Sequence, residues 1–247
     1  MSKIYEALKQ ASRQKQGCLP LPQQALQHPP HAPSIGPEEC HMEEEMLCLY
    51  KAVETALPDA SKKILQFISA RKGEGTSTLI RELAQLTATK IGKSVLLLDA
   101  DRHTPTQHHY FNIHYDRGWQ EAVNDDTLIT SVLHKAQNMD LYIGPSSNSR
   151  AATPSIFDAH TLNGFWRSVW ERFDLILIDS PPLTVSPDGL AIAPKVSGVV
   201  IVVEAEKTPS ALVKNLKERI ERVGGNVLGI VLNKRRYYIP RFIYERM

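Results

Sequence analysis

Residues 63–78 read KILQFISARKGEGTST, and this stretch decides the fold. Its first seven residues form an almost continuous apolar run, which is typical of a β-strand covered on both faces. A glycine-rich loop follows, and residues 76–90 have the pattern of an α-helix. Backbone N–H groups converge in such a loop, and the helix dipole adds partial positive charge there. The stretch therefore predicts a strand, a loop and a helix that together bind phosphate.

One position departs from the P-loop pattern that this stretch otherwise follows. The pattern places Gly-Lys-Ser at positions 75–77, and Thr76 occupies the lysine position. That lysine supplies positive charge to the β- and γ-phosphates, so the loop alone is also compatible with an ordinary strand-to-helix turn. Arg71 and Lys72 are candidates to replace the charge. The residues expected to line a nucleotide are Arg71, Lys72, Gly73, Glu74, Gly75, Thr76, Ser77 and Thr78.

Strand and helix patterns alternate through the rest of the chain. Such alternation predicts an α/β fold, with a mainly parallel sheet that has helices on both faces and right-handed crossovers. Ligands of such sheets bind at the carboxyl ends of the strands. Besides 63–69, the expected strands are 94–99, 140–144, 174–179, 198–204 and 226–232, and the expected helices are 43–57, 76–90, 118–124, 158–171, 188–194 and 208–223.

Acidic side chains follow two of the predicted strands. Asp99 is the last residue of the strand 94–99, and Asp101 follows two residues later. Asp179 is the last residue of the strand 174–179. Carboxylates at this edge can hold Mg²⁺ and can orient an attacking group. Either acidic group alone could equally cap a solvated loop. Together with the phosphate loop, in this order along an α/β pattern, the acids predict a nucleotide site with a metal ion.

Composition and the N-terminal residues indicate which partners and which cellular location to expect. The net charge of +2 among 247 residues gives no reason to expect a nucleic-acid partner. The longest apolar runs fall well short of the ~20 residues of a spanning helix, and the N-terminus does not resemble a signal peptide, so we expect a cytoplasmic protein. Residues 1–16 predict an amphipathic docking helix, or else a frayed terminus. Residues 17–41 are proline-rich and predict a linker.

Several motifs together resemble the bacterial tyrosine autokinases of capsule and exopolysaccharide synthesis, which share the MinD/ParA-type P-loop fold. The opening MSKIYEALK resembles the start of many of those proteins. The stretch VLLLDAD at 95–101, together with Pro105 and His108, resembles their second acidic motif, called Walker A′. FDLILIDSPP at 173–182 is similar to their Walker B motif, and Asp188 fits the acidic residue that follows. GIVLNK at 229–234 resembles the strand whose asparagine, here Asn233, meets adenine.

The resemblance implies ATP and Mg²⁺ as cofactors. Ser77, Asp99 and Asp179 would lie near the metal, and Asp99 and Asp101 would activate a tyrosine hydroxyl. The expected partner is a membrane polysaccharide copolymerase, or chain-length regulator, which would hold the protein at the inner face of the plasma membrane. The resemblance also implies homo-oligomers, in which each subunit presents its tyrosine tail to the active site of a neighbour. The candidate phosphoacceptors are Tyr237, Tyr238 and Tyr244.

The same resemblance has departures that keep three functions open. Beside Thr76, the kinases carry basic residues at the positions of His103 and Thr104, and Cys48 interrupts their Glu-x-x-Arg-x-x-Arg assembly motif. The chain is therefore an active tyrosine kinase or ATPase, a catalytically impaired regulatory module, or a MinD/ParA-like positioning ATPase. The tail could also simply pack on the domain or meet a partner. The expected organisation is a docking helix at 1–16, a proline-rich linker at 17–41, a kinase-like domain at 42–234 and an aromatic-basic tail at 235–247.

Overall fold

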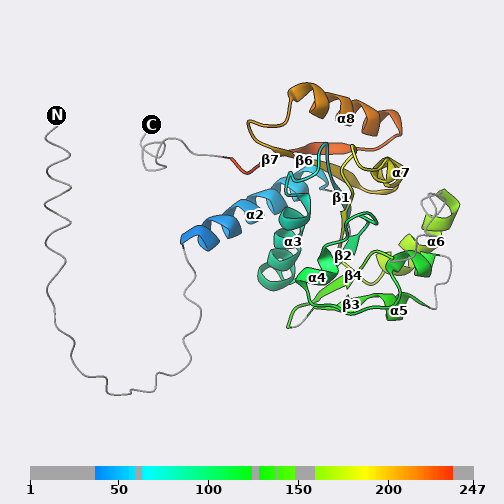
Figure 1. Ribbon diagram of the computed structural model, residues 1–247. Helices are drawn as coiled ribbons and strands as arrows, with labels where there is room; N and C mark the ends of the chain where they lie inside the picture. Colours follow the sequence, from blue (N-terminus) through cyan, green and yellow to red (C-terminus); the bar gives the residue numbers. More distant parts are fainter. Residues whose placement is uncertain (1–36, 59–62, 124–127, 137, 148–158, 236–247) are drawn as a thin grey trace, which may run out of the picture. The chain divides into compact units, whose positions relative to one another are not determined.

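A computed structural model describes residues 37–58, 63–123, 128–136, 138–147 and 159–235 (Figure 1). The predicted docking helix at 1–16 and all three candidate phosphoacceptor tyrosines lie outside the described residues. The described part contains no helix that is long and apolar enough to cross a membrane.

A seven-stranded sheet forms the centre of the described residues, and its strand order is β3-β4-β2-β5-β1-β6-β7 (Figure 1). Every neighbouring pair is parallel except β3 with β4, which is antiparallel. This confirms the predicted mainly parallel sheet, although the short strand β3 was not predicted. The strands are β1 (Lys63–Ser69), β2 (Val95–Asp99), β3 (His134–Lys135), β4 (Leu141–Gly144), β5 (Leu175–Asp179), β6 (Gly198–Glu204) and β7 (Val227–Asn233).

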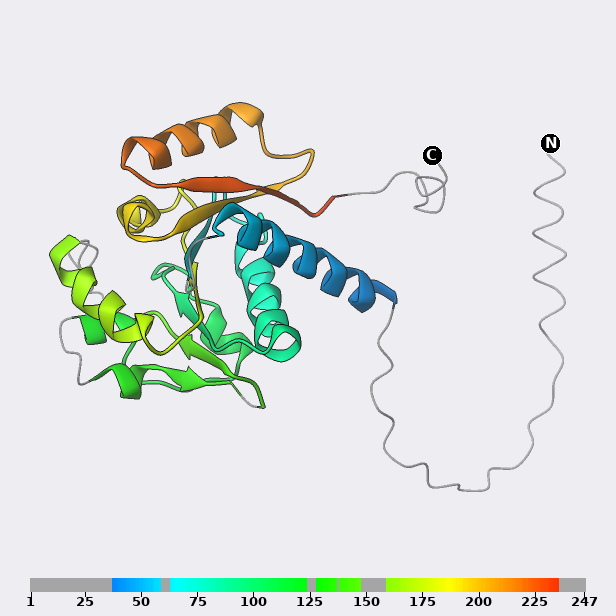
Figure 2. The ribbon, with the colours of Figure 1, turned by 180° about the vertical axis from the view of Figure 1, so that it is seen from behind.

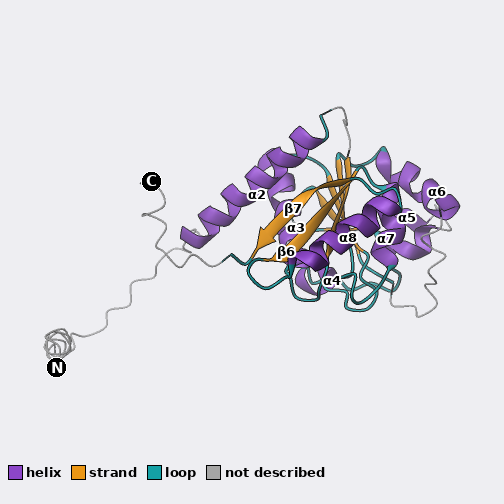
Figure 3. Cartoon of the chain, turned by 90° about the horizontal axis from the view of Figure 1, so that it is seen from above, coloured by secondary structure: helices purple, strands orange, loops and turns teal. Residues whose placement is uncertain are grey.

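Helices cover both faces of this sheet, as Figure 3 shows in a view from above. Alternate residues of β1 point to opposite faces: Leu65 and Phe67 pack in the core beside α2 and α3, whereas Ile64 and Ile68 join the clusters on the other side. All four side chains are at most 3% exposed. The continuous apolar runs of the sequence are thus explained, because each central strand buries both of its faces.

The helices agree with the predicted ones to within a few residues, with three differences. First, α2 starts at Pro37, so it includes residues that were predicted to belong to the linker. Second, the predicted helix 76–90 divides into α3 and a π-helical turn, η1. Third, the short helices α4 and α5 were not predicted. Figure 2 shows the helices from behind. Their bounds are α2 (Pro37–Ala56), α3 (Thr76–Leu86), η1 (Thr87–Ile91), α4 (Gln107–Tyr110), η2 (Trp119–Val123), α5 (Ile129–Val132), α6 (Ala159–Trp170), α7 (Asp188–Ile192), η5 (Ala193–Lys195) and α8 (Ser210–Arg222).

The strand order brings the two acidic motifs and the phosphate loop to one place. β5 lies between β1 and β2, and Asp179 is in register with Phe67 on one side and Asp99 on the other. The loop that leaves β1 therefore starts beside both carboxylates. This is the edge at which parallel α/β sheets bind their ligands.

Candidate nucleotide site

The loop between β1 and α3 has a backbone that suits an anion. Gly73 and Gly75 adopt φ of 90° and 89°, which is the left-handed region that glycine enters without steric cost. Gly75 is the N-cap of α3, and no side chain caps this helix end. The first N–H groups of α3 have no intrahelical acceptor, so they are available to a phosphate group.

Glu74 holds this loop in place from inside the protein. Its side chain is 2% exposed and accepts hydrogen bonds from the backbone N–H of Arg71 (2.8 Å) and from the hydroxyl of Thr208. Asn233, at the end of β7, donates from Nδ2 to the carbonyl oxygen of Glu74 over 2.9 Å. Glu74 thus ties the loop to the segment between β6 and α8, and Asn233 ties it to β7.

Thr76, at the position of the missing lysine, places a buried hydroxyl group in the loop. Thr76 is 7% exposed, and its hydroxyl oxygen has no hydrogen-bond partner among the described residues. Arg71 and Lys72 are exposed at the rim of the loop. A further cation that sequence reasoning had not singled out also reaches the loop: Lys234 donates from Nζ to the carbonyl oxygen of Gly73.

Asp99 is fully buried and supports the loop that follows it. Its Oδ2 accepts the backbone N–H groups of Thr106 (2.9 Å) and Gln107 (3.1 Å), and its Oδ1 accepts that of Asp101 (3.1 Å). Burial and the charge of neighbouring Asp179 raise the pKa of Asp99 to about 8, although the three N–H donors oppose that shift. A cation at this place would oppose the shift, because positive charge stabilises the ionised form of both carboxylates.

Asp101 has a different environment from Asp99. Its Oδ1 accepts the backbone N–H groups of His103 (2.9 Å) and Thr104 (3.0 Å), and its Oδ2 accepts the Thr104 hydroxyl (3.0 Å). The side chain is 9% exposed. These contacts form a local turn, so Asp101 shapes the segment that leads from β2 to Gln107.

Asp179 completes the acidic group, and the nearby Ser77 side chain lowers the pKa of its carboxyl group against the effect of burial. Gln107 donates from Nε2 to Asp179 Oδ2 (2.8 Å) and to the carbonyl oxygen of Ser77 (3.1 Å). Burial is the main cause that raises the pKa of Asp179 to about 6.

The donor set fits a nucleotide with its metal ion. Carboxylate and hydroxyl oxygens are the ligands that Mg²⁺ prefers, and here they lie beside an uncapped helix start. Two buried oxygens, Thr76 Oγ1 and Gln107 Oε1, have no partner among the described residues. Buried polar atoms are normally hydrogen-bonded, so these two are accounted for if a ligand or its water occupies the site.

Sequence reasoning missed three supports of the site. Gln107 bridges the loop and the acids, Arg102 forms an ion pair with Asp188 (2.7 Å), and Trp119 donates from Nε1 to the carbonyl oxygen of Asp99 (2.7 Å). None of them belongs to a spacing pattern that indicates its role. Their closeness depends on how the segment after β2 folds back over the sheet.

The fold and the site define a P-loop NTPase. The sequence model of the ParA family, described as an NUBPL iron-transfer P-loop NTPase, matches residues 60–243. The chain belongs to this family, in agreement with the MinD/ParA-type fold predicted from its motifs.

Individual relatives agree with the resemblance to bacterial tyrosine kinases. The tyrosine-protein kinase CpsD of Streptococcus agalactiae is 28% identical over 188 residues, which is 75% of this chain and 82% of CpsD. The succinoglycan biosynthesis transport protein ExoP of Rhizobium meliloti is 27% identical over 186 residues, which is 74% of this chain but 24% of ExoP. The crystal structure of the chimerical protein CapA2B2 has the same fold, with a TM-score of 0.72 at 23% identity over 82% of this chain and 87% of that one.

Proposed function

We propose that the protein binds ATP with Mg²⁺ at the carboxyl ends of β1, β2 and β5, and acts in the synthesis of an extracellular polysaccharide. The observation that carries the proposal is the register of Asp99 and Asp179 on neighbouring strands, beside a glycine loop whose helix start has no cap. A structural role alone gives no reason to bury two adjacent carboxylates in a part of the protein that binds no cation.

Each element of the site has a distinct role in this proposal. The N–H groups of the loop from Gly73 to Thr78 hold the phosphates, and Ser77 and Asp179 hold the metal. Bound Mg²⁺ supplies positive charge that neutralises the phosphates. Asp99 contributes negative charge toward the metal and keeps the following loop in place. Asp101 is proposed to orient the attacking group, and Asn233 to contact the base.

The biological setting follows from the relatives. A tyrosine-protein kinase and a protein named for succinoglycan biosynthesis and transport both align with most of this chain. We propose that the protein regulates polymerisation or export through a membrane copolymerase, at the inner face of the plasma membrane. These names favour the polysaccharide role over a positioning ATPase. Self-association that brings Tyr237, Tyr238 and Tyr244 to a neighbouring site belongs to the same proposal.

A second candidate function, an impaired kinase-like regulatory module, is supported by Thr76. Charge-assisted hydrogen bonds to phosphate are about twice as strong as neutral ones, and phosphoryl transfer relies mainly on electrostatic stabilisation. A neutral threonine at this position favours binding without rapid transfer. In this version the protein senses nucleotide and passes its state to the partner.

Calorimetric titration of the purified full chain with ATP, with and without Mg²⁺, tests binding. We expect Mg²⁺-dependent binding that Asp179→Asn weakens about tenfold or more. Asp140→Asn is the matched control, because Asp140 is an exposed carboxylate that immediately precedes β4, at the amino end of that strand. Absence of binding by the wild-type chain up to millimolar ATP would show that the proposal is wrong.

Incubation with ATP and Mg²⁺, followed by mass spectrometry of the tail, separates the two candidate functions. An active kinase phosphorylates its tail tyrosines in the wild-type form and loses this in Asp99→Asn. An impaired module binds ATP without modification, and Thr76→Lys gains phosphorylation. If Thr76→Lys binds ATP normally and still shows no transfer, the missing lysine is not what prevents the reaction.

A further inference from the structure

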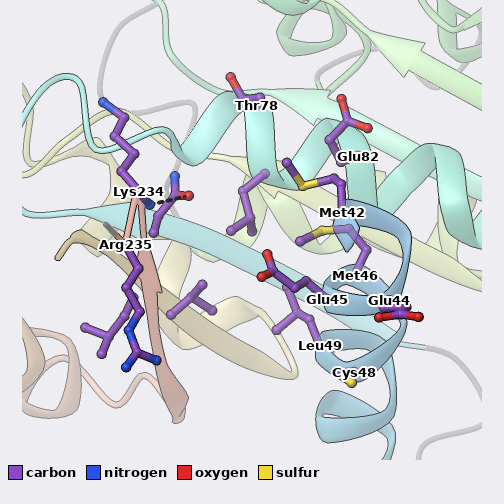
Figure 4. A pocket seen from close by; sticks show the side chains of 14 residues that line it. Met42, Glu44, Glu45, Met46, Cys48, Leu49, Thr78, Glu82, Lys234 and Arg235 are labelled. Atoms are coloured by element: carbon purple, nitrogen blue, oxygen red, sulfur yellow. Dashed lines mark hydrogen bonds between the residues drawn. The ribbon is translucent and has the colours of Figure 1, made fainter. Parts of the chain in front are cut away.

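A large groove lies beside the nucleotide site, between α2, α3 and β7. It encloses about 700 Å³, which is within the range of ligand-binding pockets. Figure 4 shows the side chains of α2 on one side of the groove and those at the end of β7 on the other. The lining residues are Met42, Glu44, Glu45, Met46, Cys48, Leu49, Thr78, Leu79, Glu82, Val231, Leu232, Asn233, Lys234 and Arg235.

The two walls of this α2–β7 groove differ in charge. The helical wall carries three carboxylates, those of Glu44, Glu45 and Glu82, between apolar side chains. The β7 wall carries Lys234 and Arg235, and Lys234 already lies 3.7 Å from Glu204. Within the described residues, neither Glu45 nor Glu82 forms an ion pair. The helical wall therefore suits a segment that is both apolar and basic.

The strand that forms one wall of the groove is an edge strand with exposed apolar side chains. β7 pairs only with β6 in the described sheet, and Leu232, which lines the groove, is 64% exposed. Ile230, two residues earlier on the same strand, is 48% exposed. Unpaired edge strands with exposed apolar side chains readily take up another segment of chain. Some part of this protein or of a partner is thus expected to cover the groove.

We propose that the C-terminal tail of the same chain, residues 236–247, occupies the α2–β7 groove. The tail reads RYYIPRFIYERM and combines aromatic and aliphatic side chains with Arg236, Arg241 and Arg246. Its first residue is bonded to Arg235, which itself lines the groove. Twelve residues can extend about 40 Å, which is ample to follow a groove that starts at their own attachment point.

Because the tail is covalently attached at the edge of the groove, it is favoured over a second copy of the chain as the occupant. A tethered segment has a millimolar effective concentration at a neighbouring site, which a second copy of the chain reaches only at high protein concentration. The charges are complementary as well, because the tail carries three arginines against one glutamate, and the helical wall carries the carboxylates of Glu45 and Glu82. Asn233 and Lys234 contribute both to the groove and to the rim of the phosphate loop, so a docked tail lies next to the nucleotide site.

Cys48 provides a direct probe, because it is an exposed free thiol that lines the groove. With Cys18→Ser and Cys40→Ser in every protein, the rate at which a thiol reagent modifies Cys48 reports whether the groove is covered. We expect a chain that ends at Arg235 to react about fivefold faster than the full-length chain, because thiol reactivity follows access. Adding a peptide of residues 236–247 to the shortened chain should restore protection. Equal rates for the full-length and shortened chains would overturn the proposal, and circular dichroism would check that both are folded.

Point variants in the full-length chain test the charge pairing and the source of the tail. Arg241→Glu together with Arg246→Glu should expose Cys48 as the truncation does, whereas Arg222→Glu on α8 should not. The labelling rate should stay constant over a roughly hundredfold range of protein concentration. Protection that appears only at high concentration would mean that a second copy covers the groove, and would overturn docking within one chain. None of these readouts depends on nucleotide binding.

Discussion

The guanidinium group of Arg102 forms a forked contact with Asp188, with Nε donating to Oδ2 over 2.7 Å and an Nη nitrogen donating to Oδ1 over 3.3 Å. This pair joins the loop after β2 to the first turn of α7. Asp188 is 3% exposed and Arg102 is 25% exposed at their side chains. The buried carboxylate of Asp188 is therefore neutralised by the protein itself, whereas Asp99 and Asp179 form no ion pair within the described residues. This contrast separates a structural acid from the two proposed to serve a metal.

Replacing Arg102 should destabilise the fold by leaving the Asp188 carboxylate buried without this partner. We expect Arg102→Met to lower the free energy of unfolding by about 2 kcal/mol, below the full cost of breaking a buried pair because the arginine is partly exposed. Urea denaturation measures this, and Lys214→Met is the control. Lys214 and Glu218 are an exposed pair 3.9 Å apart, whose loss should cost under about 0.5 kcal/mol. If Asp188→Asn does not reduce the effect of Arg102→Met, the ion pair is not its cause.

The two glycines of the phosphate loop should respond differently to alanine. Both have φ near 90°, which costs an alanine about 1–2 kcal/mol. A Cβ at Gly75 would also lie 2.2 Å from Nδ2 of Asn233, whereas a Cβ at Gly73 would meet nothing within 4 Å. Gly75→Ala should therefore be the more destabilising of the two, and it should release Asn233 from the loop. Equal unfolding midpoints for the two variants would contradict the close approach of Asn233.

Acid should remove the contribution of Glu54 to stability. Burial alone would raise its pKa, but hydrogen bonding to Lys63 at 3.0 Å and the charge of Lys93 lower it below the ordinary value. A lowered carboxyl pKa means that its stabilisation is present above the unfolded pKa and is lost as pH falls through the folded value. Glu54→Gln should thus destabilise the protein at pH 7, because the buried Lys63 ammonium loses its ion pair with Glu54, and the difference should vanish well below pH 4.5.

Glu43→Gln is the matched control for that experiment. Glu43 and Lys90 form an exposed pair at 3.4 Å, so its loss should move the urea midpoint little at either pH. A difference between wild type and Glu54→Gln that persists unchanged into acid would show that the charge of Glu54 is not the cause.

The sequence predicted the parts of the fold that depend on periodicity. Central strands such as β2 and β5 are apolar up to their terminal aspartate because both faces are buried. Those two aspartates lie side by side because the strands are parallel neighbours. The short antiparallel strand β3 has only two residues, His134 and Lys135, and no pattern marks so short a segment. The early start of α2 at Pro37 was also missed, because its first turn follows a proline-rich stretch that favours extended chain.

The finer construction of the site depended on contacts that no spacing predicts. Asp99, Asp179 and Ser77 were placed in one site by their strand and loop positions alone, and the structure brings them together. The sequence could not indicate that both oxygens of Asp99 accept backbone N–H groups, since this depends on how residues 101–107 fold back. Gln107 is the clearest example, because nothing in the sequence around it indicates a role in the site. Only the structure shows that its side-chain amide donates to both the Ser77 carbonyl oxygen and Asp179.

Gln107 therefore gives a test that separates stability from function. Gln107→Leu keeps the approximate size of the side chain but removes the donor to Asp179 and to the carbonyl oxygen of Ser77, which should cost about 1–3 kcal/mol of stability. Gln120→Leu is a close match, because Gln120 is also buried and bonds Ser146 (3.1 Å) and Ser147 (2.7 Å) away from the acids. Urea denaturation should show comparable losses for both variants. In calorimetric titrations, only Gln107→Leu should change the Mg²⁺ concentration at which ATP binding is half-maximal, since only Gln107 positions a carboxylate proposed to hold the metal. An equal change in both variants would mean that Gln107 supports the fold in general and not the metal site.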